Sequence, residues 1–435
     1  MKHILLSILF LTLINAQSGS LTLEESFKLC LENSAEIKIA EKELAKMKEK
    51  QWEITSQRLP KLSLKASYTR ISETPEFSLA FPGMPQPITI MESIPNRYNF
   101  SLRFEQPIFT GFRLASLKSS ADYQITAAEI QLSKKINDQK LIVTKAFWNY
   151  AKTQNLVNLL NSKIIAFEEH LKNTRAFVNN GLATQNDLLQ LEVQYSNLKI
   201  KLTEANNLNT IARTVFNKTI GVDIFNETTI SASTSVLYEF TDDEIAKINE
   251  AAILRNEVKQ IDFNILSSGE MITAARADYL PNIFAFGDYY YSCPNQQIFP
   301  MKDKFDDTWD VGIGLKWTFW DWGNTSSKVA QNKYIQEQLK LSRTELLNNI
   351  KIEIYTKYLE AKKLIEKYEL VNTSILSAQE NLRILEKKYA AHLVTSAEII
   401  DAENLLLEAE TNRDNTIADF AISLAEYYNA IGRDL

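Results

Sequence analysis

The stretch of sequence that decides the fold reads Tyr98-Asn99-Phe100-Ser101-Leu102-Arg103-Phe104-Glu105. Apolar and polar residues alternate strictly along it, which is the pattern of a β-strand with one apolar and one polar face. Lys61–Ile71 and Asp310–Phe319 alternate in the same way, and Ile283–Tyr291 is the weakest of these four segments. The sequence therefore predicts four strands in two hairpins, over about 61–110 and about 282–320.

Strict alternation over about ten residues, with aromatic residues at the ends, is typical of a transmembrane β-barrel. A sheet of a soluble protein alternates in the same way when one of its faces meets water. Aromatic residues gather at one end of each hairpin, and such clusters favour a membrane–water interface. The predicted interface residues are Phe109, Phe112, Trp317, Trp320 and Trp322.

The chain contains two copies of one long unit. A shift of 211 residues superimposes Ile220-Gly221 on Ile431-Gly432, with no gap needed from Leu102 to Gly221. Upstream the shift becomes 221, so a ten-residue insertion lies in the proline-rich stretch around 74–87, which we expect to be a loop. We therefore predict a first repeat over 17–221, a linker or equatorial region over 222–250, and a second repeat over 251–435.

Long helices follow each hairpin. No proline occurs from Phe112 to about Asn179, and a helix of that length would measure about 100 Å, too long for a compact domain. Its later apolar positions step by three and four residues, as in coiled coils. Each repeat is predicted to contain a helix, the hairpin, a long helix (about 112–179 and about 324–390) and a shorter helix (about 183–219 and about 396–431).

Residues 1–16 have a basic start, an apolar stretch and a small residue at the end, which predicts a secretory signal peptide. The net charge of −6 and the intermixed Lys and Glu argue against a nucleic-acid partner. We find no Cys/His cluster for a metal and no phosphate loop, nucleophile elbow or credible triad, so we expect neither an enzyme nor a cofactor.

Four strands cannot close a barrel, and unpaired strand edges are not tolerated in lipid. A barrel must therefore combine strands from several copies of the chain. Two copies would give eight strands and a filled interior, whereas three would give twelve strands and leave a lumen. The predicted fold is thus an α+β membrane protein, a trimeric twelve-stranded β-barrel continuous with an α-helical barrel. The alternative is an exported soluble coiled-coil scaffold or interaction protein.

Two motifs, each present twice at the same spacing, resemble those of the TolC family of outer-membrane efflux proteins. The strand-to-helix junctions Gln106–Gly111 and Trp317–Gly323 are similar to the family's Pro-Leu-Phe-Asp-Gly-Gly. The turn Gly181–Leu189 and its counterpart Tyr389–Asp401 resemble the family's helix-to-helix turn at the periplasmic tip. The resemblance covers essentially the whole mature chain.

The resemblance implies a homotrimer that lies in outer-membrane lipid and has a large periplasmic part. It further implies a passive exit duct of a tripartite efflux or type I secretion system. Docking of a periplasmic adaptor (membrane-fusion) protein and an inner-membrane pump, of RND or ABC type, would then open the tip.

The same resemblance assigns roles at the tips. Glu398 and Asp401 match paired aspartates that ring the closed tip, and they are three residues apart, on one helix face. In a trimer they would form a cation-selective constriction; the alternative is that acids in the first turns complement the helix dipole. Tyr389 matches a latch tyrosine, and Asp187 is a second latch candidate. Val394 and His392 depart from the family pattern, so the gating network is expected to differ.

The turns themselves are the predicted surface for adaptor docking. The residues concerned are Gly181, Leu182, Ala183, Thr184, Leu393 and Thr395. Ordinary turn chemistry, in which Gly181 ends a helix, explains part of the same pattern.

Overall fold

A computed structural model describes residues 20–86, 88–232, 244–391 and 393–435. The predicted signal peptide, part of the predicted linker and His392 lie outside these residues. The chain forms two compact units, which are treated separately below. The sheet unit comprises Ala40–Leu132 and Asn256–Asn348, and the helical unit comprises Met1–Ile39, Ser133–Arg255 and Asn349–Leu435.

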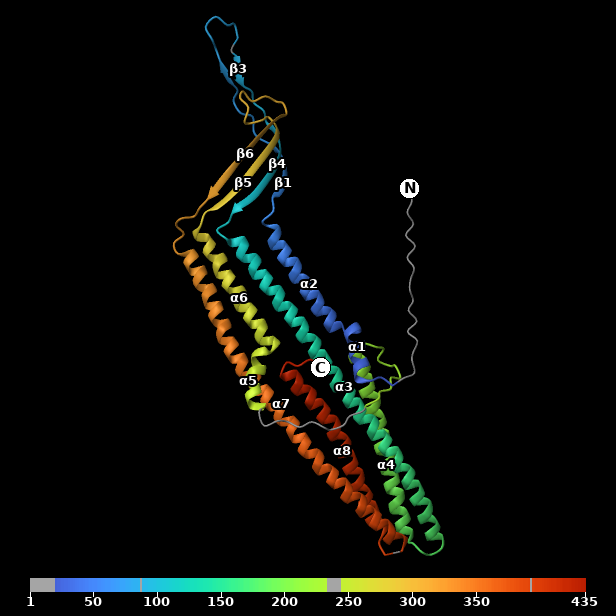
Figure 1. The fold of residues 1–435 in the computed structure, drawn as a ribbon. Helices are drawn as coiled ribbons and strands as arrows, with labels where there is room; N and C mark the ends of the chain where they lie inside the picture. Colours follow the sequence, from blue (N-terminus) through green and yellow to red (C-terminus); the bar gives the residue numbers. More distant parts are fainter. Residues whose placement is uncertain (1–19, 87, 233–243, 392) are drawn as a thin grey trace, which may run out of the picture. The chain divides into compact units, whose positions relative to one another are not determined.

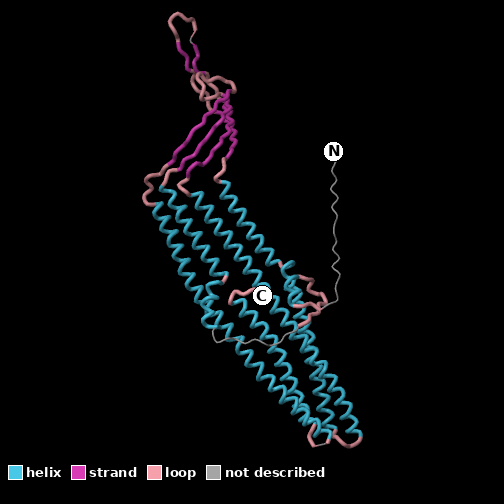
Figure 2. The backbone as a smooth tube through the Cα atoms, viewed as in Figure 1, coloured by secondary structure: helices cyan, strands magenta, loops and turns pink. Residues whose placement is uncertain are grey.

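The sheet unit contains one four-stranded antiparallel sheet (Figure 2). Its strands are β1 (Lys61–Arg70), β4 (Asn96–Phe109), β5 (Asn282–Cys293) and β6 (Asp306–Lys316), in the order β1-β4-β5-β6. Each strand runs antiparallel to its neighbours. The four predicted strands are therefore confirmed, and β1 and β6 form the two edges of the sheet.

The register of the sheet separates an apolar face from a polar one. Leu64 lies opposite Leu102, which lies opposite Tyr289, which lies opposite Trp309. One residue away, on the other face, the corresponding row is Ser63, Arg103, Asp288 and Asp310. Because side chains alternate between faces along a strand, these two rows fix which face each residue occupies.

Strand β5 alternates weakly because two of its aromatic residues lie on the polar face. Phe284 is paired with Gly314 and Phe286 with Gly312. A Cβ added at Gly312 would lie 2.8 Å from Cζ of Phe286, so each ring occupies the space above a glycine. A strand that carries large apolar side chains on both faces has no clear period of two, which explains the weak signal in this part of the sequence.

Two sequence predictions about the hairpins need correction. The proline-rich stretch around 74–87 is not wholly a loop, because β2 (Phe77–Leu79) pairs with β3 (Ile88–Met91) in a small second sheet. Strand β6 ends at Lys316, although the alternation continues to Phe319. The indole of Trp317 donates a hydrogen bond to the Tyr279 carbonyl (3.1 Å), so the chain leaves the sheet at that point.

The helices are drawn in Figure 1. The two long ones, α3 (Arg113–Asn179) and α7 (Asn324–Ala390), each contain 67 residues; they are followed by α4 (Gln185–Ile220) and α8 (Ser396–Ala430). The predicted single helix before each hairpin is in fact two helices. They are α1 (Leu23–Asn33) and α2 (Ala35–Ser56), then α5 (Glu244–Leu254) and α6 (Asn256–Arg276). None of the helices in the described part of the chain is both long and apolar enough to cross a membrane.

The first of these breaks lies at Ser34 and the second at Arg255. Ser34 has a ψ of 120°, which ends α1, and its hydroxyl accepts a hydrogen bond from the Ile37 amide (3.4 Å). Arg255 is buried and donates to the Ala430 carbonyl (2.5 Å), beside the end of α8. Because that contact joins residues 175 apart in sequence, the second break could not be found from local pattern.

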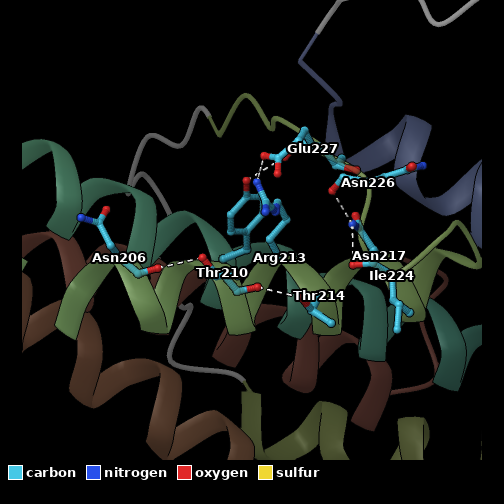
Figure 3. A network of polar contacts seen from close by, with 10 residues as sticks. Asn206, Thr210, Arg213, Thr214, Asn217, Ile224, Asn226 and Glu227 are labelled. Atoms are coloured by element: carbon cyan, nitrogen blue, oxygen red, sulfur yellow. Dashed lines mark hydrogen bonds and ion pairs between the residues drawn. The ribbon is translucent and has the colours of Figure 1, made fainter. Parts of the chain in front are cut away.

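The helical unit has a core of aromatic and aliphatic side chains between α1, α3, α4 and α8. Phe147 and Phe216 are fully buried at its centre, with ring centroids 6.0 Å apart. Helix α4 is followed by its C-cap Gly221, which has a φ of +76°, a value that glycine adopts without strain. The segment that follows is held against α4 by the side chain of Asn217 (Figure 3), which donates to the carbonyls of Ile224 and Asn226 (3.3 and 2.8 Å).

Candidate functional site

The apolar face of the four-stranded sheet is exposed over all four strands. Leu64 is 76% exposed on β1 and Val311 is 73% exposed on β6. The large exposed side chains of this face are Leu62, Leu64, Tyr68, Tyr98, Phe100, Leu102, Phe104, Tyr289, Tyr291, Trp309, Val311, Ile313 and Leu315. Apolar patches of this extent mark surfaces that meet another protein or a membrane.

The predicted interface aromatics lie where the sheet joins the long helices. Phe109 and Phe112 pack edge to face with centroids 5.4 Å apart, and Trp320 and Trp322 do the same at 5.6 Å. Phe112 and Trp322 have positive φ values (70° and 56°), which are uncommon for residues other than glycine. Trp322 is 89% exposed. The two junctions thus share a strained turn that carries an exposed ring, and its role at a membrane interface stays a prediction.

Both helix-to-helix turns of the helical unit end in a capping box. Thr184 and Asp187 exchange hydrogen bonds at the start of α4, and Thr395 and Glu398 do so at the start of α8. In front of these caps, Leu182 is 56% exposed and Leu393 is 74% exposed. The duplicated turns therefore present equivalent leucines to solvent. Gly181 has a φ of +73° with open space around it, and Ala183 is half-buried.

The two acids of the predicted constriction differ in their contacts. The Glu398 carboxylate accepts hydrogen bonds from the amide and hydroxyl of Thr395 (2.8 and 3.1 Å). The backbone hydrogen bond and then the side-chain hydrogen bond from Thr395 lower the pKa of Glu398. Asp401 instead lines a groove of about 440 Å³ between α4 and α8, with Leu189 and Ile400 among its other lining residues. The capping alternative thus applies to Glu398, and the role of Asp401 in a constriction stays a prediction.

The latch candidates Tyr389 and Asp187 are brought together through Ser396. The Tyr389 hydroxyl lies 3.1 Å from the Thr174 hydroxyl and 3.1 Å from the Ser396 hydroxyl, and both partners are buried. The hydrogen bond from the Thr184 side chain lowers the pKa of Asp187, and further hydrogen bonds from Ser396 act in the same direction. These residues come from α3, α4, α7 and α8, so one polar cluster joins all four helix ends. Sequence reasoning missed Thr174 and Ser396.

A ladder of ionisable side chains links α3 to α8 along the helical unit. Its rungs are Lys145–Glu426, Lys152–Asp419 (2.8 Å), Lys163–Glu410 (3.1 Å) and His170–Glu403 (3.5 Å). Residue numbers rise along α3 while they fall along α8, as expected for antiparallel helices. The first two and the last two rungs are seven residues apart on each helix, which matches a coiled-coil repeat.

The ends of the ladder differ in electrostatics. Burial acts to raise the pKa of Glu426, but hydrogen bonds from Lys145 and Lys357 outweigh burial and hold the pKa below its ordinary value. At the other end, burial raises the pKa of Glu403 to about 7, and Lys163 offsets only part of this effect. No group of three or more His, Cys, Asp or Glu side chains that could hold a metal occurs among the described residues.

Comparison with known proteins gives a consistent picture. Residues 27–222 and 248–433 each match the family described as outer membrane efflux protein. The chain is 20% identical to the outer membrane protein TolC of Vibrio cholerae serotype O1 over 336 residues, which is 76% of each protein. Its fold is similar to that of VceC from Vibrio cholerae (TM-score 0.76, 13% identity, 94% of this chain and 96% of that one). It is also similar to that of the MtrE outer membrane channel of Neisseria gonorrhoeae, in its open state (TM-score 0.75, 16% identity, 95% and 89%).

The family match covers nearly the whole chain in two copies, and both copies fall on the repeats of the sequence. The family resemblance and the two-repeat fold, with four strands and long helices, are therefore confirmed. The chain belongs to the outer membrane efflux protein family, and it is a TolC-type efflux channel of the outer membrane with a periplasmic helical part, a transport protein rather than an enzyme.

Proposed function

We propose that three copies of this chain form a passive exit duct, and that docking of a periplasmic adaptor and an inner-membrane pump opens its helical tip. The geometry needed to close the four-stranded sheet into a barrel supports three copies. Strands β1, β4, β5 and β6 alternate in direction, so β6 runs opposite to β1. The β6 edge of one copy can therefore pair antiparallel with the β1 edge of the next. Three copies give a twelve-stranded barrel with a lumen.

The two faces of the sheet support its orientation in the barrel. The apolar face, with Leu64 and Val311, would meet lipid, and the polar face, with Arg103 and Asp288, would line the lumen. Arg103 lies 3.7 Å from Asp288, so these two charges of the lining form an ion pair. Charged residues are costly on the lipid face of a barrel and are accepted on its lumen face.

The helix ends support a gate at the periplasmic tip. In each copy, the cluster around Tyr389 and Ser396 would hold the α7 end against α3 and α8. The exposed Leu182 and Leu393 offer apolar contacts to the tips of adaptor helices. Asp401 from three copies would make the constriction cation-selective. The MtrE relative is described in an open state, and we propose that this chain opens as well.

The observation that carries the proposal is the apolar face that continues across all four strands between two open edges. The test is the mass of the purified full-length protein in detergent, together with ion conductance after reconstitution into planar bilayers. We expect a trimer and stable conducting steps. A monomer that is soluble without detergent and forms no conducting steps would instead support the exported coiled-coil scaffold.

A further inference from the structure

A buried carboxylate lies in the helical unit and has no part in the proposed gate. Glu403 of α8 is only 6% exposed. Its Oε1 atom lies 3.5 Å from Nε2 of His170 on α3, and its Oε2 atom has no hydrogen-bond partner among the described residues. A buried carboxylate with an unpaired oxygen is costly in its charged form. The protonation state of Glu403 therefore affects how favourably α8 packs against α3.

The charges around Glu403 do not compensate its negative charge well. On α3, Lys163 attracts it, but the Lys163 amine lies 3.1 Å from Glu410, a second acid of α8. On α7, Glu386 repels it. Among the described residues, only His170 lies within 4 Å of the Glu403 carboxylate as a possible ion-pair partner, at 3.5 Å.

The fourth helix near this position contributes a neutral contact. The Gln194 amide of α4 donates to Asn404, the residue after Glu403 (2.8 Å). Within the part of the chain that the structure describes, the charged groups that shift the pKa of Glu403 are Lys163 of α3 and Glu386 of α7, and neither belongs to α4. Further along α8, Asp401 is exposed and faces the groove beside α4.

The position of Glu403 connects it to the latch. Each latch residue shares a helix with one residue of the group around Glu403. On α3, Thr174 is four residues after His170, and on α7, Tyr389 is three residues after Glu386. On α8, Ser396 is seven residues before Glu403. Residues three, four and seven apart lie on one face of a helix. The group of His170, Glu386 and Glu403, here called the acid layer, is thus the next layer behind the latch.

We propose that the acid layer is a proton-responsive lock: it keeps α8 packed against α3 while Glu403 is neutral, and it loosens that packing when Glu403 becomes charged. The inference deepens the proposed function, because the latch that it supports is the proposed gate. The added element is control of the gate by pH through a group outside the constriction.

The direction of the pH effect follows from linkage. Burial raises the pKa of Glu403 from 4.5 to about 7, which Lys163 lowers in part and Glu386 raises further. Below about pH 4.5 the side chain is neutral both in the packed and in the opened state, and packing is fully favoured. As pH rises toward 7, the opened state loses its proton first, so packing weakens. The difference between a pKa of 4.5 in the opened state and about 7 in the packed state shifts the ratio of packed to opened states by up to ~300-fold.

Hydrogen exchange of the full-length protein in detergent tests the inference. Protection of the segment 396–410 would be measured at about pH 5.5 and about pH 8, with exchange times scaled for the chemical rate. We expect protection in the wild type to fall at least ~10-fold at the higher pH. Glu403→Gln should keep the protection of low pH at both values. Glu408→Gln, a change of an exposed acid on the same helix, should behave like the wild type.

Equal protection of the wild type at both pH values, or an unchanged pH effect in Glu403→Gln, would overturn the inference. Should Glu403→Gln fail to fold, infrared spectra of the wild type decide, since a protonated carboxyl band must disappear with a midpoint near pH 7. Planar bilayers keep the two proposals separate. Absence of conductance at every pH would refute the exit duct, while hydrogen exchange would still test the acid layer.

Discussion

A lysine on the apolar face of β1 distinguishes a lipid-facing sheet from a water-facing one. Leu64 and Ser67 lie on opposite faces of this strand, and both are exposed in the single chain. In a sheet surrounded by water, Leu64→Lys and Ser67→Lys should each change the free energy of unfolding by no more than about 0.5 kcal/mol. In a barrel, Leu64→Lys places a charge in the hydrocarbon at about 2–4 kcal/mol per subunit, or ~6–12 kcal/mol per trimer.

Ser67→Lys is the matched control, because Ser67 lies opposite neutral Asn99 on the polar face, the proposed lumen lining. Folding into phospholipid vesicles from urea, followed by tryptophan fluorescence and by gel mobility of the heated and unheated trimer, measures the difference. We expect Leu64→Lys to lose the trimer and Ser67→Lys to retain it. Equal stability of the two variants would refute the assignment of this face to lipid.

Three further predictions concern the helical unit. Tyr389→Phe removes the hydroxyl that bonds two buried hydroxyls, which should weaken the closed tip by about 1–3 kcal/mol and raise the open fraction in single-channel recordings. Asp401→Asn should lower the ratio of cation to anion permeability from reversal potentials more than Glu398→Gln does, because the Glu398 carboxylate is engaged in the helix cap. Hydrogen bonds hold the pKa of Glu426 below its ordinary value, so the carboxylate stabilises the fold above about pH 4.5 and this stabilisation is lost as pH falls further. Glu426→Gln should therefore reduce the fall in melting temperature at acidic pH, measured by thermal unfolding scans.

The strands and the repeat were predictable because each leaves a pattern that can be read from the sequence alone. Alternation over about ten residues identifies a strand without knowledge of its partner. The repeated Ile-Gly and Leu-Pro pairs align two copies of one unit without reference to structure. The start and end of α7 follow from the residues around Gly323 and from the turn before Thr395.

The contacts between helices were not predictable in the same way. Thr174 and Ser396 are ordinary helix residues in the sequence, and only the register of α3 against α7 and α8 places them at Tyr389. Lys152 and Asp419 likewise pair across 267 residues. Charged residues on a helix usually meet solvent, so no local pattern marks those that form a ladder between two helices.

The two sides of α3 differ in chemistry, and this difference decides which movement of the helical unit is favoured. Toward α4, Leu160, Phe167 and Leu171 pack against buried leucines, and separating that surface would lose about 25 cal/mol for each Å² of apolar area exposed. Toward α8 the contacts combine ion pairs with apolar packing, because Leu407 joins the same cluster and Ala418 joins the core around Phe147. The more exposed rung Lys152–Asp419 contributes little to stability because solvent screens it. The α3/α4 pair should therefore stay intact while α8 moves, and Glu403 is the rung of the ladder whose charge changes near neutral pH.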